Sequence, residues 1–127
     1  MTSTTDLPLP RRILVIEEDR AVSDLFSTWL AAEGHAVVRE AAAEAAPAGP
    51  VDLVVVDVPY PRRRGVDWVR RVAERHPMTP ILALSCTLFA GVECGGPVAR
   101  SLGADCVLPK PVSRQALLKQ VNHLLSR

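Results

Sequence analysis

The sequence predicts a single α/β domain, in which a doubly wound, five-stranded parallel sheet is flanked by helices. Short apolar runs alternate along the chain with amphipathic stretches of helical spacing, as in a repeated strand and helix unit. One run, residues 53–56, is continuously apolar, which is typical of a strand buried on both faces of a parallel sheet. The 127 residues suit one domain. We assign residues 11–127 to it and residues 1–10 to a flexible N-terminal arm.

The first part of the chain predicts two strands around one long helix. The strands are the apolar runs at residues 13–16 and 36–38. Apolar residues between them recur at helical spacing, Asp19 or Ser23 can cap the start of this helix, and Gly34 can end it. The alanine-rich residues 41–46 predict about one and a half further turns of helix before a stretch rich in proline and glycine.

The rest of the chain repeats this alternation. The remaining strands are residues 53–56, 81–84 and 106–108. Helical spacing predicts helices over residues 65–75, over residues 97–102 and from Ser113 onward. Pro97 suits a first helical turn, Ser113 can cap the last helix, and residues 86–96 are expected to form a long loop. Each parallel connection needs a crossover, which these helices provide.

Composition excludes several classes of protein. Apolar residues make up 48% of the chain and charged residues 23%, values that argue against disorder and coiled coil. The formal net charge of +1 gives no reason to expect nucleic-acid binding. No apolar run approaches the roughly 20 residues of a membrane span, and the start of the chain does not resemble a signal peptide. We therefore expect a cytoplasmic protein without membrane contact.

The cysteines predict neither a disulfide framework nor a zinc site. There are three of them, an odd number without a CxxC spacing: Cys86, Cys94 and Cys106. We expect small, buried or half-buried thiols.

Polar residues collect where the predicted strands end. These residues are Glu17, Glu18 and Asp19 after the first strand, then Asp57, Ser85 and Lys110 after three others. Singly, each has an ordinary explanation as a helix cap, a loop hydroxyl or a surface cation. Together they suit phosphoryl transfer, because carboxylates gather Mg²⁺ and one of them can attack phosphorus while lysine and serine contact other phosphate oxygens.

From Arg12 to about Leu125 the sequence resembles the receiver domains of two-component response regulators, which have a flavodoxin-like (βα)5 fold. The resemblance rests on four segments, residues 13–19, 52–61 with Gly65, 80–85 and 103–111. It implies that Asp57 is the phosphoacceptor and that Ser85 is the switch hydroxyl. It also implies that Lys110 precedes a cis peptide bond to Pro111.

The resemblance further implies a cofactor and partners. Mg²⁺ would be held by Glu17, Glu18, Asp57 and the backbone carbonyl of Pro59. A histidine kinase or phosphotransfer protein would donate the phosphoryl group. A downstream protein, or an output domain outside this chain, would receive the signal, and homodimers are compatible with the family. Such a domain catalyses only its own phosphorylation and dephosphorylation and is not otherwise an enzyme.

Four features depart from the family pattern. Glu18 replaces the usual aspartate ligand, and Val107 replaces the usual switch aromatic. The segment between Ser85 and Gly103 is longer than usual, which predicts a shortened helix there, and Arg62 to Arg64 add charge to a predicted loop. The alternative is therefore a degenerate receiver that acts as an interaction module without phosphorylation. An aspartyl phosphatase is disfavoured, because Pro59 cannot donate a proton two residues after Asp57.

Overall fold

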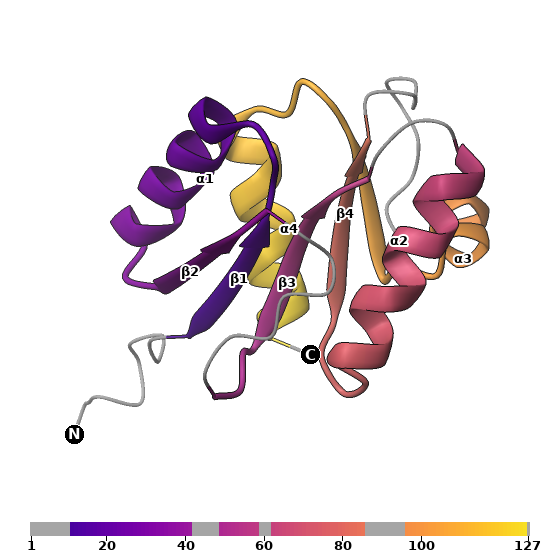
Figure 1. Cartoon of the computed structure of the whole chain (residues 1–127). Coiled ribbons are helices and arrows are strands. Elements are labelled where there is room, and N and C mark those ends of the chain that lie inside the picture. Colours follow the sequence, from indigo (N-terminus) through magenta and orange to yellow (C-terminus); the bar gives the residue numbers. More distant parts are fainter. Residues whose placement is uncertain (1–10, 42–48, 59–61, 86–95, 127) are drawn as a thin grey trace.

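The computed structural model describes residues 11–41, 49–58, 62–85 and 96–126, and these residues form five parallel strands and four helices (Figure 1). The strands are β1 (Arg12–Ile16), β2 (Ala36–Glu40), β3 (Leu53–Asp57), β4 (Ile81–Ser85) and β5 (Cys106–Pro109). The helices are α1 (Arg20–Ala32), α2 (Arg62–Arg75), α3 (Pro97–Leu102) and α4 (Arg114–Leu125). The predicted α/β class and all five predicted strands are confirmed.

The sheet has the order β2-β1-β3-β4-β5, and every neighbouring pair is parallel. The chain moves outward from β1 to β2 and then returns to place β3 on the other side of β1. This is the flavodoxin-like order, whose direction reverses between β1 and β3. In such sheets a ligand site lies beyond the carboxyl ends of the strands at that switch point, which here are Ile16 and Asp57.

Helices cover both faces of the sheet, with α1 and α4 on one side and α2 and α3 on the other (Figure 1). Because side chains alternate along a strand, each central strand contributes to both layers of the core. The α1 and α4 layer includes Ile13, Val15, Val55, Phe26, Leu30, Leu117 and Val121. The α2 and α3 layer includes Leu14, Val54, Val56, Val69, Val72, Ala99 and Val107. Burial on both faces explains the unbroken apolar run of β3.

The start of α1 resolves the two capping candidates. Asp19 is the cap, and its side chain accepts a hydrogen bond from the backbone N–H of Val22 at 3.1 Å. Ser23 is buried inside the helix, where its hydroxyl accepts a hydrogen bond from Nε of Arg39 at 3.0 Å. Gly34, with φ of 92°, follows the helix in the left-handed conformation that glycine adopts readily.

One expected helix begins earlier than predicted, and another lies almost entirely outside the described residues. The helix expected over residues 65–75 begins three residues earlier, at Arg62, so the three arginines form its first turn and not a loop. Arginine is a good helix former, and Gly65 costs only about 1 kcal/mol in a helix interior. Residues 42–46 of the helix expected at 41–46 lie outside the described residues, as do most of the 86–96 loop and the whole arm, residues 1–10. The short helix expected at 97–102 is confirmed.

The prediction of three unpaired thiols was wrong. Cys106, which is fully buried at the start of β5, is disulfide-bonded. Cys86 and Cys94, the other two cysteines, lie outside the described residues. The odd number and irregular spacing of the cysteines concealed the bond, because pairing depends on the distance between residues in the fold.

Candidate functional site

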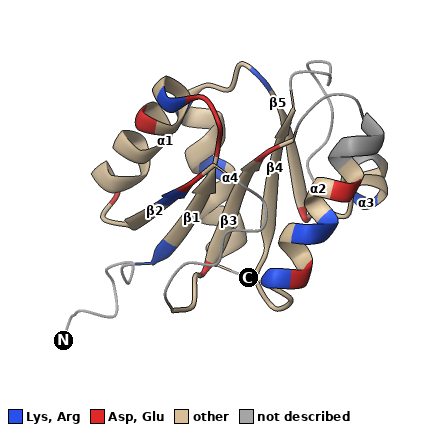
Figure 2. Ribbon diagram, in the orientation of Figure 1, with Lys and Arg blue, Asp and Glu red and all other residues tan. Residues whose placement is uncertain are grey.

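Three of the predicted site residues meet at the carboxyl edge of the sheet. Glu17 follows β1, Asp57 ends β3, and Lys110 follows β5. The Lys110 ammonium lies 2.9 Å from Oδ1 of Asp57 and 3.2 Å from Oε1 of Glu17. Figure 2 shows these charges on the ribbon, with acidic segments after β1 and at the end of β3 and a basic segment after β5. A single cation therefore links two carboxylates across the switch point.

Lys110 is held by charge in a partly buried position, with 20% of its side chain exposed. Burial alone would lower the pKa of Lys110, but its hydrogen bonds and ion pairs with Asp57 and Glu17 outweigh burial and raise that pKa. The lysine is therefore a firmly charged group at neutral pH. It is placed to stabilise negative charge on whatever binds next to Asp57.

Glu17 is the more buried of the two acids, with only 3% of its side chain exposed. Its Oε2 accepts a hydrogen bond from the backbone N–H of Asp19 at 3.2 Å, while Oε1 contacts Lys110. Burial raises the pKa of Glu17 and the neighbouring Asp57 adds to the rise, whereas the Asp19 N–H and Lys110 oppose it. The pKa of Glu17 is raised overall, because burial removes the ionised carboxylate from water.

Glu18 follows Glu17 and lines the same surface hollow, but the ion pairs of Lys110 are with Glu17 and Asp57. Glu18 is exposed, and the hollow, of about 550 Å³, is also lined by residues from α1 and β2 that include Ser23, Asp24 and Arg39. Arg39 crosses from β2 to α1, where it also forms an ion pair with Asp24. No local spacing in the sequence predicts this cluster, because it depends on α1 lying beside β2.

Ser85 ends β4 beside the lysine. It is buried, with 5% exposure, and its backbone oxygen accepts a hydrogen bond from the Lys110 N–H at 3.0 Å. The predicted cis peptide bond between Lys110 and Pro111 is confirmed. Pro59, the predicted carbonyl ligand, lies outside the described residues.

The donor set fits Mg²⁺ in its chemistry, because Glu17 and Asp57 offer carboxylate oxygens and already share one cation. They do not form a complete cage. Within the four described ranges, no three acidic, histidine or cysteine side chains are grouped closely enough to hold a metal ion. The third predicted acid, Glu18, would have to turn toward the cluster from its exposed position.

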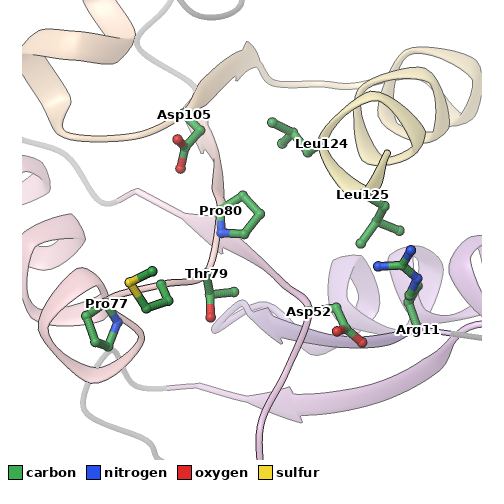
Figure 3. Close-up of a pocket in the computed structure, with 9 residues that line it drawn as sticks. Arg11, Asp52, Pro77, Thr79, Pro80, Asp105, Leu124 and Leu125 are labelled. Carbon is green, nitrogen blue, oxygen red and sulfur yellow. The ribbon is translucent and has the colours of Figure 1, made fainter. Parts of the chain in front are cut away.

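A second hollow, of about 430 Å³, lies at the opposite edge of the sheet (Figure 3). Asp52, Asp105, Thr79, Arg11 and Leu125 are among the residues that line it. Both carboxylates already accept backbone hydrogen bonds at 2.8 Å, Asp52 from Arg12 and Asp105 from Ile81. These acids fasten the starts of strands, and none of the predicted site residues lies here.

Comparison with known proteins identifies the family. Residues 13–122 match the family model described as the response regulator receiver domain. The chain belongs to this family. The match covers all of the sheet except Arg12 and includes the acidic edge, so the receiver identity and the fold predicted from the sequence are confirmed.

Curated relatives of this receiver include two transcriptional regulatory proteins of bacteria. It is 31% identical to the transcriptional regulatory protein CpxR of Klebsiella pneumoniae over 91% of the chain and 50% of that protein. It is 33% identical to the transcriptional regulatory protein PdtaR of Mycobacterium tuberculosis over 99% of the chain and 62% of that protein. The receiver thus spans about half to three fifths of the length of these relatives.

A solved structure of a putative response regulator from Chloroflexus aurantiacus aligns with a TM-score of 0.73 and 27% identity, over 94% of this chain and 100% of that one. In the described part of the receiver, no helix has both the length and the apolar character to cross a membrane.

Proposed function

We propose that this receiver accepts a phosphoryl group on Asp57 and passes the signal on through protein contacts. The observation that carries the proposal is the contact of Lys110 with both Asp57 and Glu17 at the switch point of a receiver fold. Asp57 keeps 25% of its side chain exposed, so a donor can reach its oxygen. Glu17 and Lys110 are the more enclosed partners that surround it.

The proposed reaction moves a phosphoryl group from an oxygen or nitrogen atom of the donor to a carboxylate oxygen of Asp57. An oxygen of Asp57 forms a bond to phosphorus while the bond from phosphorus to the donor atom breaks, and the donor keeps that electron pair. Lys110 remains protonated and balances charge on a phosphoryl oxygen. Ser85 lies at the end of the neighbouring strand, and its hydroxyl is proposed to contact another phosphoryl oxygen.

Mg²⁺ is the proposed cofactor, with Glu17 and Asp57 as ligands and with Glu18 and the Pro59 carbonyl completing the set by family resemblance. When bound, the ion would neutralise charge on the phosphoryl oxygens. Glu17 suits the role of ligand because it is buried beside Asp57, where water would compete poorly for the ion.

The proposed donor is a histidine kinase or its phosphotransfer protein. The named relatives are transcriptional regulators, which supports an output through a target protein or through a domain beyond this chain. We further propose that the receiver works in the cytoplasm, that it makes no direct contact with nucleic acid, and that it catalyses no reaction except its own phosphorylation and dephosphorylation.

A phosphorylation-independent interaction module is the second candidate. Two observations favour it. Glu18 is exposed and outside the contact between Lys110 and the other acids, and Val107, fully buried against the α2 and α3 layer, has no ring that could turn inward. Under this reading the surface would be the same with and without a ligand at Asp57.

Titration with beryllofluoride and Mg²⁺, followed by amide chemical shifts, distinguishes the two candidates. Wild type is expected to respond at the carboxyl edge of the sheet. Lys110→Ala should bind Mg²⁺ equally or more tightly, because a competing cation is gone, yet show a weaker beryllofluoride response. Lys119→Ala, which removes an exposed lysine of α4, is the control and should behave as wild type. Equal responses in all three proteins would remove Lys110 from the mechanism, and no response in wild type would favour the module.

A further inference from the structure

Helix α2 concentrates the positive charge of the receiver. Its fourteen residues contain six arginines and only two acids, Asp67 and Glu74, which gives the helix a formal charge of +4. The whole chain has a charge of +1, so the rest of it carries three more acids than bases. Figure 2 shows basic and acidic segments alternating along this helix. The charge is therefore local to one element.

The outer face of α2 has a defined charge pattern. Val69 and Val72 are fully buried and fix which side of the helix packs on the sheet. On the other side, Arg70 and Arg71 keep 68% and 50% of their side chains exposed and flank Asp67, which is 47% exposed. At about 100° per residue, the two arginines lie on opposite sides of the line that joins positions 67 and 74.

The ion pairs of this face lie in solvent. Arg70 and Arg71 both pair with Asp67, and all three side chains are about half exposed or more. Exposed pairs of this kind contribute only about 0 to 1 kcal/mol, which a partner carboxylate can replace. Guanidinium groups also bind carboxylates through two parallel hydrogen bonds, which favours a carboxylate-bearing partner.

The position of Asp67 favours a protein partner over nucleic acid. A nucleic-acid backbone has evenly spaced negative charge and would meet Asp67 as well as the arginines, which opposes binding. A protein segment can place its acids only where the arginines lie. We propose that the outer face of α2 is a docking surface for an acidic protein segment, centred on Arg70 and Arg71. Docking of this kind does not require phosphorylation of Asp57.

The experiment uses a labelled twenty-residue polyglutamate peptide as the probe and fluorescence anisotropy as the measurement. At low ionic strength, Arg70→Gln/Arg71→Gln should bind the peptide about fivefold more weakly than wild type, a loss of about 1 kcal/mol. Arg114→Gln/Lys119→Gln is the matched control, because it also removes two cations from one helix and one of them, Arg114, also pairs with an acid. The control should change the affinity less than about twofold.

A second variant makes the opposite prediction. Asp67→Asn removes the carboxylate between the two arginines and should tighten peptide binding by about two- to fivefold, a gain that misfolding cannot mimic. All effects should shrink at about 0.15 M salt because exposed charges are screened. Three results would overturn the proposal: the same loss of affinity in the control as in the α2 variant, no gain in Asp67→Asn, or a single-stranded oligonucleotide of equal charge binding more tightly than the peptide. Absence of peptide binding to wild type would also overturn it.

Discussion

Glu17 shows how single residues define this site. The fold buries its carboxylate beside Asp57, and the pKa of Glu17 rises because burial outweighs the contacts with the Asp19 N–H and Lys110. A glutamate whose pKa is higher in the folded state than in the unfolded state favours folding most at low pH, and that contribution is lost as pH rises through the folded pKa. At neutral pH the ionised Glu17 therefore lowers stability.

Glu17→Gln should consequently raise the melting temperature relative to wild type at pH 7, and the gain should shrink toward pH 4 as wild-type Glu17 becomes protonated. The measurement is thermal unfolding at both pH values without metal. Glu40→Gln removes another acid, at the end of β2, and controls for overall charge. A Glu17→Gln variant less stable than wild type at pH 7 would mean that the ion pair with Lys110 dominates instead.

Glu18 differs from the family aspartate by one methylene and is exposed, so its length is expected to limit metal binding. Mg²⁺ requires ligand oxygens at about 2.0 to 2.1 Å in octahedral array, and a misplaced oxygen is costly. Glu18→Asp should tighten Mg²⁺ binding about tenfold, which needs only about 1.4 kcal/mol. Isothermal titration of both proteins measures this. Equal affinities would show that position 18 does not limit the site.

At the scale of elements, Asp19 acts as the cap of α1, because its side chain accepts a hydrogen bond from the Val22 N–H while its own backbone N–H donates to Glu17. Asp19→Ala should destabilise the fold by about 1 kcal/mol. Ser113→Ala is the matched variant, since Ser113 caps α4 through the Ala116 N–H at 3.0 Å. Denaturant unfolding should give similar losses for both, and Mg²⁺ affinity should be unchanged within about twofold. A tenfold loss of Mg²⁺ affinity in Asp19→Ala alone would make Asp19 a ligand.

The elements also show what sequence patterns can predict. The central strands followed directly from apolar runs, because burial on both faces favours apolar side chains along β3 and β4 up to their last residues, Asp57 and Ser85. The start of α2 was missed, since arginines suit a loop and a helix alike and only the backbone distinguishes them. The sequence offered both Asp19 and Ser23 as caps, and the structure has Asp19 as the cap and Ser23 in a long-range hydrogen bond with Arg39 of β2, which no local pattern predicts.

At the scale of the whole molecule, parallel topology explains why so much of the site could be predicted. The carboxyl ends of β1, β3 and β4 and the residue after β5 meet at one edge, so residues that follow strands in the sequence become neighbours in space. Lys110 and Glu17, 93 residues apart, come within 3.2 Å in this way. The exposure of Glu18 and the disulfide at Cys106 could not be predicted, because each depends on side-chain placement that no strand order determines.

Incubation with a small acyl-phosphate donor and Mg²⁺, followed by intact mass spectrometry, tests the proposed acceptor most directly. Wild type should gain a single acid-labile phosphoryl group, and Asp57→Asn should gain none while unfolding cooperatively like the wild type. Asp52→Asn, which changes an aspartate at the opposite edge of the sheet, should still be labelled. Label that persists in Asp57→Asn, or wild type that stays unlabelled at saturating Mg²⁺, would contradict Asp57 as the phosphoacceptor.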